Sequence, residues 1–333
     1  MTPLRGLRYV AATWLAAATT TVGAATPAAT PPAPAPAELH ILPVQGNISM
    51  LVGAGGNITV QSGSDGVLLV DTGLAPNSEK VLAAVRSLSD KPIRYIINTH
   101  VHADHVGGNE AIAKAGTTIA GGNVVGDIGS SASNQATIIA FQTVLDRMST
   151  PAAGASAPAS PQGAWPTDTY TTPERKIFFN NEGVEMIHVP AAHTDGDTIV
   201  FFRRSDVIST GDIFVTNGYP IIDLDHGGNI QGVIAGLDRI VELAIPADEQ
   251  EGGTLIIPGH GRLCDVADVV YYQEMVIIIR DRIQALIKKG MTLEQVKAAQ
   301  PTRDYDPRYG STTGIWTTDK FVTAVYKSLT APH

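Results

Sequence analysis

Cysteine is nearly absent from this 333-residue chain, which contains only Cys264. A single cysteine excludes an internal disulfide framework and any zinc cluster built from several thiolates. Basic side chains are in the minority, since 23 Lys and Arg against 32 Asp and Glu give a formal net charge of −9. This balance argues against a nucleic-acid-binding protein, because phosphate recognition needs a basic face. With 44% hydrophobic and 17% charged residues, disorder throughout is also excluded.

The N-terminus is typical of a secretory signal peptide. Arg5 and Arg8 precede an apolar stretch that runs to about Ala25, and small residues suit cleavage near Ala24 or Ala25. The stretch is too short and too rich in threonine to span a membrane, which takes about 20 strongly apolar residues. We therefore expect a signal peptide at 1–25 and a periplasmic or secreted protein, with no membrane span in the mature chain.

The rest of the chain predicts an extended linker followed by one folded domain. Residues 26–38 are almost entirely Pro and Ala and predict an extended spacer. We expect a single domain at 39–333, with a surface insertion at the Pro/Ala/Ser/Gly-rich stretch 149–166. Within it, hydrophobic patterning predicts strands at 39–44, 48–53, 57–61, 66–71, 93–98, 184–190, 198–203, 206–210 and 254–258, the first four antiparallel. It predicts helices at 77–88, 110–115, 123–147, 230–244, 266–289 and 293–300.

Polar clusters follow four of the predicted strands directly. Loops that leave rigid strands are where a fold brings side chains to one point. Imidazole and carboxylate groups without thiolate suit zinc and similar divalent ions. The candidate ligands in these loops are His100, His102, Asp104, His105, His193, Asp212 and His260.

The spacing in the first cluster supports two neighbouring ions. In an extended loop, His100 and His102 point to the same side and can share one ion. Asp104 and His105 stand where the loop turns into a helix, and can face a second ion beside the first. Ordinary structural roles remain open, because Asp104 could cap the helix and His260 could be a polar loop residue. Three histidines and one aspartate within six residues nevertheless favour a metal site.

The His-x-His-x-Asp-His segment, followed by His193, Gly211-Asp212 and Pro258-Gly259-His260-Gly261, resembles the metallo-β-lactamase fold superfamily. The resemblance runs from about residue 48 to residue 261. It implies an α/β fold, a four-layer αβ/βα sandwich with two mixed sheets, and two zinc ions at one edge. Asp71, at the end of an early strand, matches the family's aspartate that acts on a metal ligand rather than on the metal.

The resemblance also implies a role for each ligand. His100, His102 and His193 would bind the first ion, and Asp104, His105 and His260 the second, with Asp212 between the two. A metal-bound hydroxide would attack a carbonyl or phosphoryl centre, and Asp104 would orient the attacking water or accept its proton. No serine, cysteine or lysine nucleophile is then required. We expect Cys264 to be a buried structural thiol.

Asp212 departs from the true β-lactamases, which carry Cys or Ser at that place. Aspartate there is similar to glyoxalase II, lactonases, RNase Z and persulfide dioxygenases, and the overall pattern resembles exported quinoprotein-relay relatives. The acidic surface and export signal speak against RNase Z. The absence of a basic cluster in residues 271–289 speaks against glyoxalase II. β-Lactam hydrolysis is therefore possible but not implied.

Three functional hypotheses remain. The first is a dinuclear zinc hydrolase that acts on a small ester, thioester, lactone or amide, β-lactams included. The second is a persulfide-dioxygenase-like sulfur oxidoreductase with one iron, which would be bound through His100, His102, His193 and Asp212. The third is a non-catalytic periplasmic partner of a dehydrogenase. In each enzymatic case the partner is a small molecule, and the expected walls of its pocket are Trp165, Phe214, Tyr219 and His226.

Overall fold

The computed structural model describes residues 38–118, 135–151 and 157–331. The chain divides into two units, Met1–Pro36 and Ala37–His333, and every described residue belongs to the second unit. The predicted signal peptide at 1–25 lies outside the described residues, as does the predicted linker at 26–38 except for its last residue. The predicted domain boundaries stay predictions.

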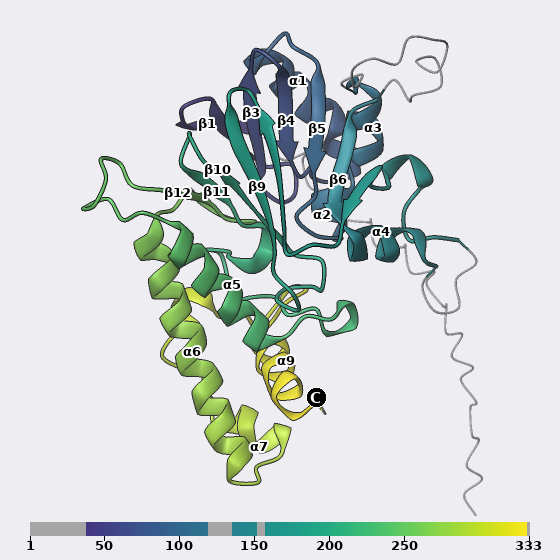
Figure 1. Ribbon diagram of the computed structural model, residues 1–333. Coiled ribbons are helices and arrows are strands. Elements are labelled where there is room, and N and C mark those ends of the chain that lie inside the picture. The colour runs from purple at the N-terminus through teal and green to yellow at the C-terminus, as the bar shows by residue number, and fades with distance from the viewer. Residues whose placement is uncertain (1–37, 119–134, 152–156, 332–333) are drawn as a thin grey trace, which may run out of the picture. The chain divides into compact units, whose positions relative to one another are not determined.

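The described residues form two mixed β-sheets (Figure 1). The first sheet contains β1 (His40–Gln45), β2 (Ile48–Val52), β3 (Ile58–Gly63), β4 (Gly66–Val70), β5 (Ile93–Ile97), β6 (Thr137–Phe141) and β7 (Asp168–Tyr170), in that order. The second contains β8 (Glu174–Phe179), β9 (Glu182–His188), β10 (Thr198–Phe202), β11 (Val207–Ser209) and β12 (Leu255–Ile257). Pairing is antiparallel from β1 to β4 and parallel from β4 to β7. In the second sheet only β11 and β12 pair in parallel.

Strand β4 explains why the two sheets stack. All five of its residues are buried, and successive side chains of a strand point to opposite faces. Val67 and Leu69 belong to a core cluster shared with helices α1 and α3. Leu68 and Val70 belong to a cluster that also contains residues of β9 and β10. A strand that is apolar on both faces is therefore covered by helices on one side and by the second sheet on the other.

Helices form the two outer layers. They are α1 (Ser78–Leu88), α2 (Ala103–Val106), α3 (Asn109–Lys114), α4 (Gln142–Ser149), α5 (Ile230–Leu243), α6 (Val266–Lys288), α7 (Leu293–Ala298), α8 (Asp306–Tyr309) and α9 (Thr318–Thr330). Helices α1 and α3 cover the first sheet, and α5, α6 and α9 share a core cluster with the outer face of the second. This arrangement confirms the predicted four-layer αβ/βα sandwich with two mixed sheets.

The longest helix of the described residues, α6, is fixed at its start by a capping box between Asp265 and Asp268. A capping box between Thr292 and Gln295 likewise begins α7. No helix in the described part of the chain combines the length and apolar character that crossing a bilayer would demand.

One predicted helix is wrong in part, and several elements were not predicted. Of the predicted helix at 123–147, residues 123–134 lie outside the described residues, and residues 137–141 form strand β6. The sequence Thr-Ile-Ile-Ala-Phe is apolar and contains β-branched residues, it pairs with β5 and β7, and its three central residues are buried. No element was predicted where strands β7 and β8 and helices α8 and α9 lie.

Candidate metal centre

Both sheets contribute to one polar cluster. His100 and His102 follow β5, and Asp104 and His105 lie in the adjoining helix α2. The second sheet supplies the rest: His193 follows β9, Asp212 lies in the 3₁₀ turn η4 (Gly211–Ile213) after β11, and His260 follows β12. The structure thus brings together all seven predicted ligands, although they span 161 positions of the chain, from 100 to 260.

The first donor group consists of His100, His102, His193 and Asp212, with one ligand atom from each within 4.8 Å of the others. His102 Nδ1 lies 2.8 Å from His193 Nε2. The ring of His100 lies edge-on to the rings of His102 and His193, at centroid distances of 4.9 and 4.6 Å. The side chains of His100 and His193 are fully buried.

The second donor group consists of Asp104, His105 and His260, again with ligand atoms within 4.8 Å of one another. His260 Nε2 lies 3.2 Å from Asp104 Oδ2 and 3.4 Å from His105 Nε2. His105 is fully buried, whereas Asp104 and His260 are partly open to solvent.

Asp212 lies between the two groups. Its Oδ1 is 3.2 Å from His105 Nε2, and its Oδ2 is 3.7 Å from His193 Nε2. One carboxylate oxygen therefore faces each group. A Cβ at Gly259 would lie 2.0 Å from Asp212 Oδ1, so only glycine lets the loop before His260 pass this close.

Asp71 holds the cluster from the side of the first sheet. Its backbone has φ of +65°, in the left-handed region. Its Oδ2 accepts hydrogen bonds from His105 Nδ1 and from Thr99 Oγ1, both at 2.7 Å, and its Oδ1 accepts one from Thr99 N at 2.8 Å. Since the hydroxyl of Thr99 donates to Asp71, the 3.0 Å contact with His100 Nδ1 has that nitrogen as its donor. Asp71 thereby orients one histidine of each group.

Asp223 holds the cluster from the opposite side, and sequence reasoning did not single it out. Its Oδ2 accepts from His102 Nε2 at 2.7 Å. Nearby, the backbone carbonyl of Ile221 accepts from His193 Nδ1 at 2.8 Å. Asp223 lies 121 positions from His102, and no local pattern in the sequence joins them.

These outer hydrogen bonds decide which nitrogens face inward. A carboxylate or carbonyl can only accept, so His102 Nε2 and His193 Nδ1 carry protons. In the neutral rings, His102 Nδ1 and His193 Nε2 are then lone-pair acceptors that face each other at 2.8 Å. Buried His100 Nε2 has no hydrogen-bond partner among the described residues. Acceptors gathered without donors suit a bound cation, and imidazole with carboxylate suits zinc.

Electrostatics differ between the groups. Burial lowers the pKa of His193 to about 4, against the opposing charge of Asp212. Burial also lowers the pKa of His260, but hydrogen bonds with Asp104 and Asp212 outweigh it and raise that pKa to about 9. Burial raises the pKa of Asp212, yet the charge of His105 and hydrogen bonds to it hold that pKa well below its usual range. Without metal, protonated imidazole is thus favoured at His260 in the second group, and neutral imidazole at His193 in the first.

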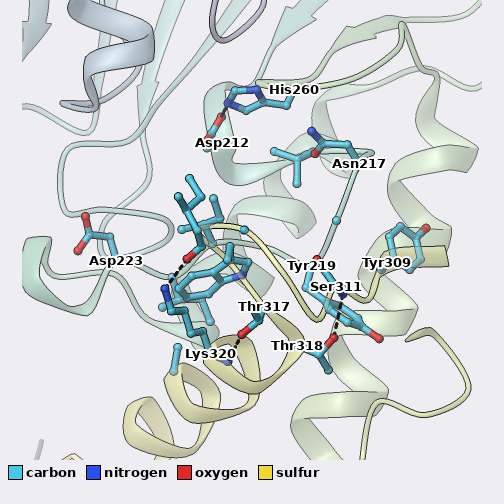
Figure 2. A pocket seen from close by; sticks show the side chains of 18 of the residues that line it. Asp212, Asn217, Tyr219, Asp223, His260, Tyr309, Ser311, Thr317, Thr318 and Lys320 are labelled. Atoms are coloured by element: carbon cyan, nitrogen blue, oxygen red, sulfur yellow. Dashed lines mark hydrogen bonds and ion pairs between the residues drawn. The ribbon is translucent and has the colours of Figure 1, made fainter. Parts of the chain in front are cut away.

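The cluster opens into a cavity of about 1090 Å³. Figure 2 shows Asp212 and His260 at one end of it, and Thr317, Thr318 and Lys320 of the C-terminal segment at the other. Apolar side chains in the lining include Val215, Ile222 and Trp316.

The four predicted pocket residues are placed differently. Tyr219 lines the cavity, but its hydroxyl is engaged with Thr302 O and Asp306 Oδ1. Phe214 is only 1% exposed and packs edge-on against Tyr272 in the core, so it is not a wall of this cavity. Trp165 packs beside helix α4, and its indole N–H donates to Ser160 O. His226 contacts Asp223, outside the lining of this cavity.

Cys264 is buried, and burial raises the pKa of its thiol to about 12. This confirms the prediction of a structural thiol, because a reactive cysteine needs a thiolate near neutral pH.

Comparisons with known proteins agree with this geometry. The family described as the metallo-beta-lactamase superfamily matches residues 51–260, which include Asp71 and all seven candidate ligands. A linear primary-alkylsulfatase of Pseudomonas sp. (strain ATCC 19151) is 25% identical over 277 residues, covering 73% of this chain and 50% of that protein.

Solved structures share the fold. The stereoselective inverting sec-alkylsulfatase Pisa1 from Pseudomonas sp. aligns with a TM-score of 0.60 and 15% identity, over 87% of this chain and 50% of that one. A metallo-beta-lactamase from Pontibacter korlensis aligns with a TM-score of 0.51 and 14% identity, over 72% of this chain and 99% of that one. The chain spans about half the length of the alkylsulfatases that it matches.

Proposed function

Because the chain belongs to the metallo-beta-lactamase superfamily, we propose that it is a hydrolase that uses two zinc ions to cleave a small ester, thioester, lactone or amide at its carbonyl group, β-lactams included. The family match and the alkylsulfatase relative support a metal-dependent hydrolase. They argue against the hypothesis of a non-catalytic partner of a dehydrogenase.

The observation that carries the proposal is a pair of donor groups with one carboxylate between them. His100, His102 and His193 would hold one ion, and Asp104, His105 and His260 the other, with an oxygen of Asp212 for each. When bound, two divalent ions supply Lewis acidity that lowers the pKa of a water and polarises the bond to be cleaved. In the first group, the outer hydrogen bonds of His102 and His193 already turn an unprotonated nitrogen inward, which is the form that metal binding requires.

The protein's own side chains have three tasks at this place. Asp71 and Asp223 fix the tautomers of His105 and His102. Asp104 lines the cavity and is partly open to solvent, so it can orient a water or accept its proton at Oδ2. The cavity of about 1090 Å³ leaves room for a leaving group and an acyl group beyond the reacting atoms.

A sulfate ester is the second candidate substrate. The alkylsulfatase relative is 25% identical over 73% of this chain. Lys320 and Lys327 both line the cavity, seven positions apart on the same face of α9. They do so in a chain whose net charge is −9. Lys320 Nζ donates to Ile315 O, and Lys327 Nζ has no hydrogen bond or ion pair among the described residues. Two ammonium groups in the lining favour an anionic substrate.

The first experiment is elemental analysis of purified protein, followed by assays with carboxyl esters, thioesters, lactones, β-lactams and alkyl sulfates. We expect two zinc ions per chain and turnover that Asp104→Ala and His102→Ala reduce at least about 100-fold. His40→Ala, at an exposed histidine of β1, is the matched control.

Two outcomes would contradict the proposal. A single iron per chain with oxygen-dependent sulfur chemistry would favour the dioxygenase hypothesis. Wild-type turnover in the folded His102→Ala and Asp104→Ala variants would exclude the site itself. Cleavage of alkyl sulfates alone would select the second candidate substrate.

We also propose that the protein is exported, which rests on the basic and apolar pattern of residues 1–25. N-terminal sequencing of protein from a bacterial periplasmic fraction should find a chain that begins near residue 25 or 26. An uncleaved N-terminus in the cytoplasm would contradict the prediction.

A further inference from the structure

His102 faces the cluster differently from the other histidines. Its Nδ1 points inward, toward His193 Nε2. His193 and His105 both face inward with Nε2, because their Nδ1 atoms are bonded to Ile221 O and Asp71. An inward Nδ1 requires that the proton of His102 stay on Nε2, and therefore that an acceptor stand beside Nε2.

That acceptor is Asp223, and several further hydrogen bonds hold its carboxylate in place. Its Oδ2 also accepts from His226 Nδ1 at 2.6 Å, and its Oδ1 accepts from the backbone N–H groups of Asp225 and His226 at 3.1 Å. Four donors thus surround its two oxygens, and together they fix the orientation of the carboxylate beside His102.

Residues 221–228, here called the 221–228 loop, make three hydrogen bonds with the first donor group. Ile221 O accepts from His193 Nδ1, Asp223 N donates to His193 O at 3.0 Å, and Asp223 Oδ2 holds His102. A Cβ at Gly228 would lie 2.3 Å from His193 O. The loop packs against the backbone of His193 so closely that loop and ligand have to move together.

We propose that Asp223 is a positioning residue that selects the metal-binding tautomer of His102, and that through it the 221–228 loop sets the metal affinity of the first donor group separately from the second. The inference rests on the proposed function, because it presumes an ion in that group. No described hydrogen bond or ion pair joins the side chain of Asp223 to His105 or His260. Removing its carboxylate should thus weaken the binding of one ion and leave the binding of the other unchanged.

The experiment is a zinc competition titration of the full chain with a chromophoric chelator. For Asp223→Ala we expect one of two dissociation constants to rise about 10- to 100-fold, the range measured when outer partners of metal ligands are removed. Elemental analysis after dialysis should then fall from two ions to one. With cobalt in place of zinc, the visible absorption of one site should weaken, a change that a loss of general stability would not produce selectively.

Asp225→Ala is the matched control, because it removes a carboxylate from the same loop whose side chain has no described partner. It should leave both dissociation constants as in the wild type. Asp223→Asn keeps an acceptor without the charge and should give an intermediate value, which also serves if Asp223→Ala does not fold.

The outcomes separate the two proposals. Wild-type dissociation constants in both Asp223 variants would overturn the present inference and leave the proposed function intact. An equal rise in both dissociation constants would overturn it as well, since the loop would then act on the whole cluster. A wild-type chain that binds no divalent ion would overturn both.

Discussion

Two aspartates support the candidate metal-binding histidines from opposite sides, and they do so in different surroundings. Asp71 is 2% exposed and follows a central strand that is buried on both faces. The side chain of Asp223 is 18% exposed and belongs to a loop. Asp71 supports one histidine of each donor group, directly for His105 and through Thr99 for His100. Asp71 and Asp223 thus make hydrogen bonds of the same length, 2.7 Å, to a histidine. Asp71 supports both donor groups, whereas the side chain of Asp223 supports one candidate ligand.

Asp71→Asn should have the largest effect. Asparagine tolerates the left-handed backbone, but its NH₂ group must face a donor, because the two oxygens of Asp71 accept three hydrogen bonds. A buried donor without a partner costs about 1–3 kcal/mol. We expect both zinc ions to be lost on dialysis and the free energy of unfolding to fall by about that amount. Denaturant titration and elemental analysis measure the two effects, and retention of both ions would remove the distinction between Asp71 and Asp223.

Gly228→Ala should act on the first donor group alone. The new Cβ would displace the 221–228 loop from His193 O, so the first zinc should bind about tenfold or more weakly and stability should change less than in Asp71→Asn. Gly183→Ala is the control, since its Cβ would meet nothing closer than 3.7 Å. If zinc affinity is the same in both variants, the loop does not hold His193 in place.

His226→Ala should have a smaller effect. The ring of His226 makes a hydrogen bond with Asp223 but with none of the seven candidate ligands, and its side chain is 38% exposed. Asp223 would keep its backbone donors and His102. We expect a change in zinc affinity of about fivefold or less, on the scale of about 1 kcal/mol for one partly exposed contact. A loss as large as that of Asp223→Ala would mean that His226, rather than the carboxylate, controls the tautomer.

The stability of the metal-free chain should also depend on pH, through one histidine of each donor group. The pKa of His260 is raised to about 9, so its contribution to stability is complete below about pH 6.5 and is lost as pH rises through 9. The pKa of His193 is lowered to about 4, so stability also falls as pH drops from 6.5 toward 4. Denaturant titrations of chelator-treated protein from pH 5 to 9.5 should therefore peak near pH 6.5. Constant stability between pH 7 and 9.5 would contradict the assignment for His260.

The sequence predicted what is local and missed what is distant. His100, His102, Asp104 and His105 are within six residues, and each of the other ligands follows an apolar strand, so both the motif and its place at strand ends were legible. Asp223 was missed because its partner His102 is 121 residues away. The helix predicted across 137–141 was wrong because pairing with β5 and β7, rather than local patterning, decides that segment. Phe214 was expected in a pocket wall, but an aromatic ring after a strand serves equally well in a core.

The way the cavity is built bears on how the substrate of this protein could change during evolution. The candidate ligands and Asp71 lie between positions 71 and 260, whereas the far wall is built by the segment around Trp316 and Lys320. Tyr219 joins the two stretches through its bond to Asp306. One wall of the cavity thus comes from a stretch of the chain that supplies none of the candidate ligands. A transplanted C-terminal segment that keeps a partner for Tyr219 should change which molecules are accepted while the reaction stays the same.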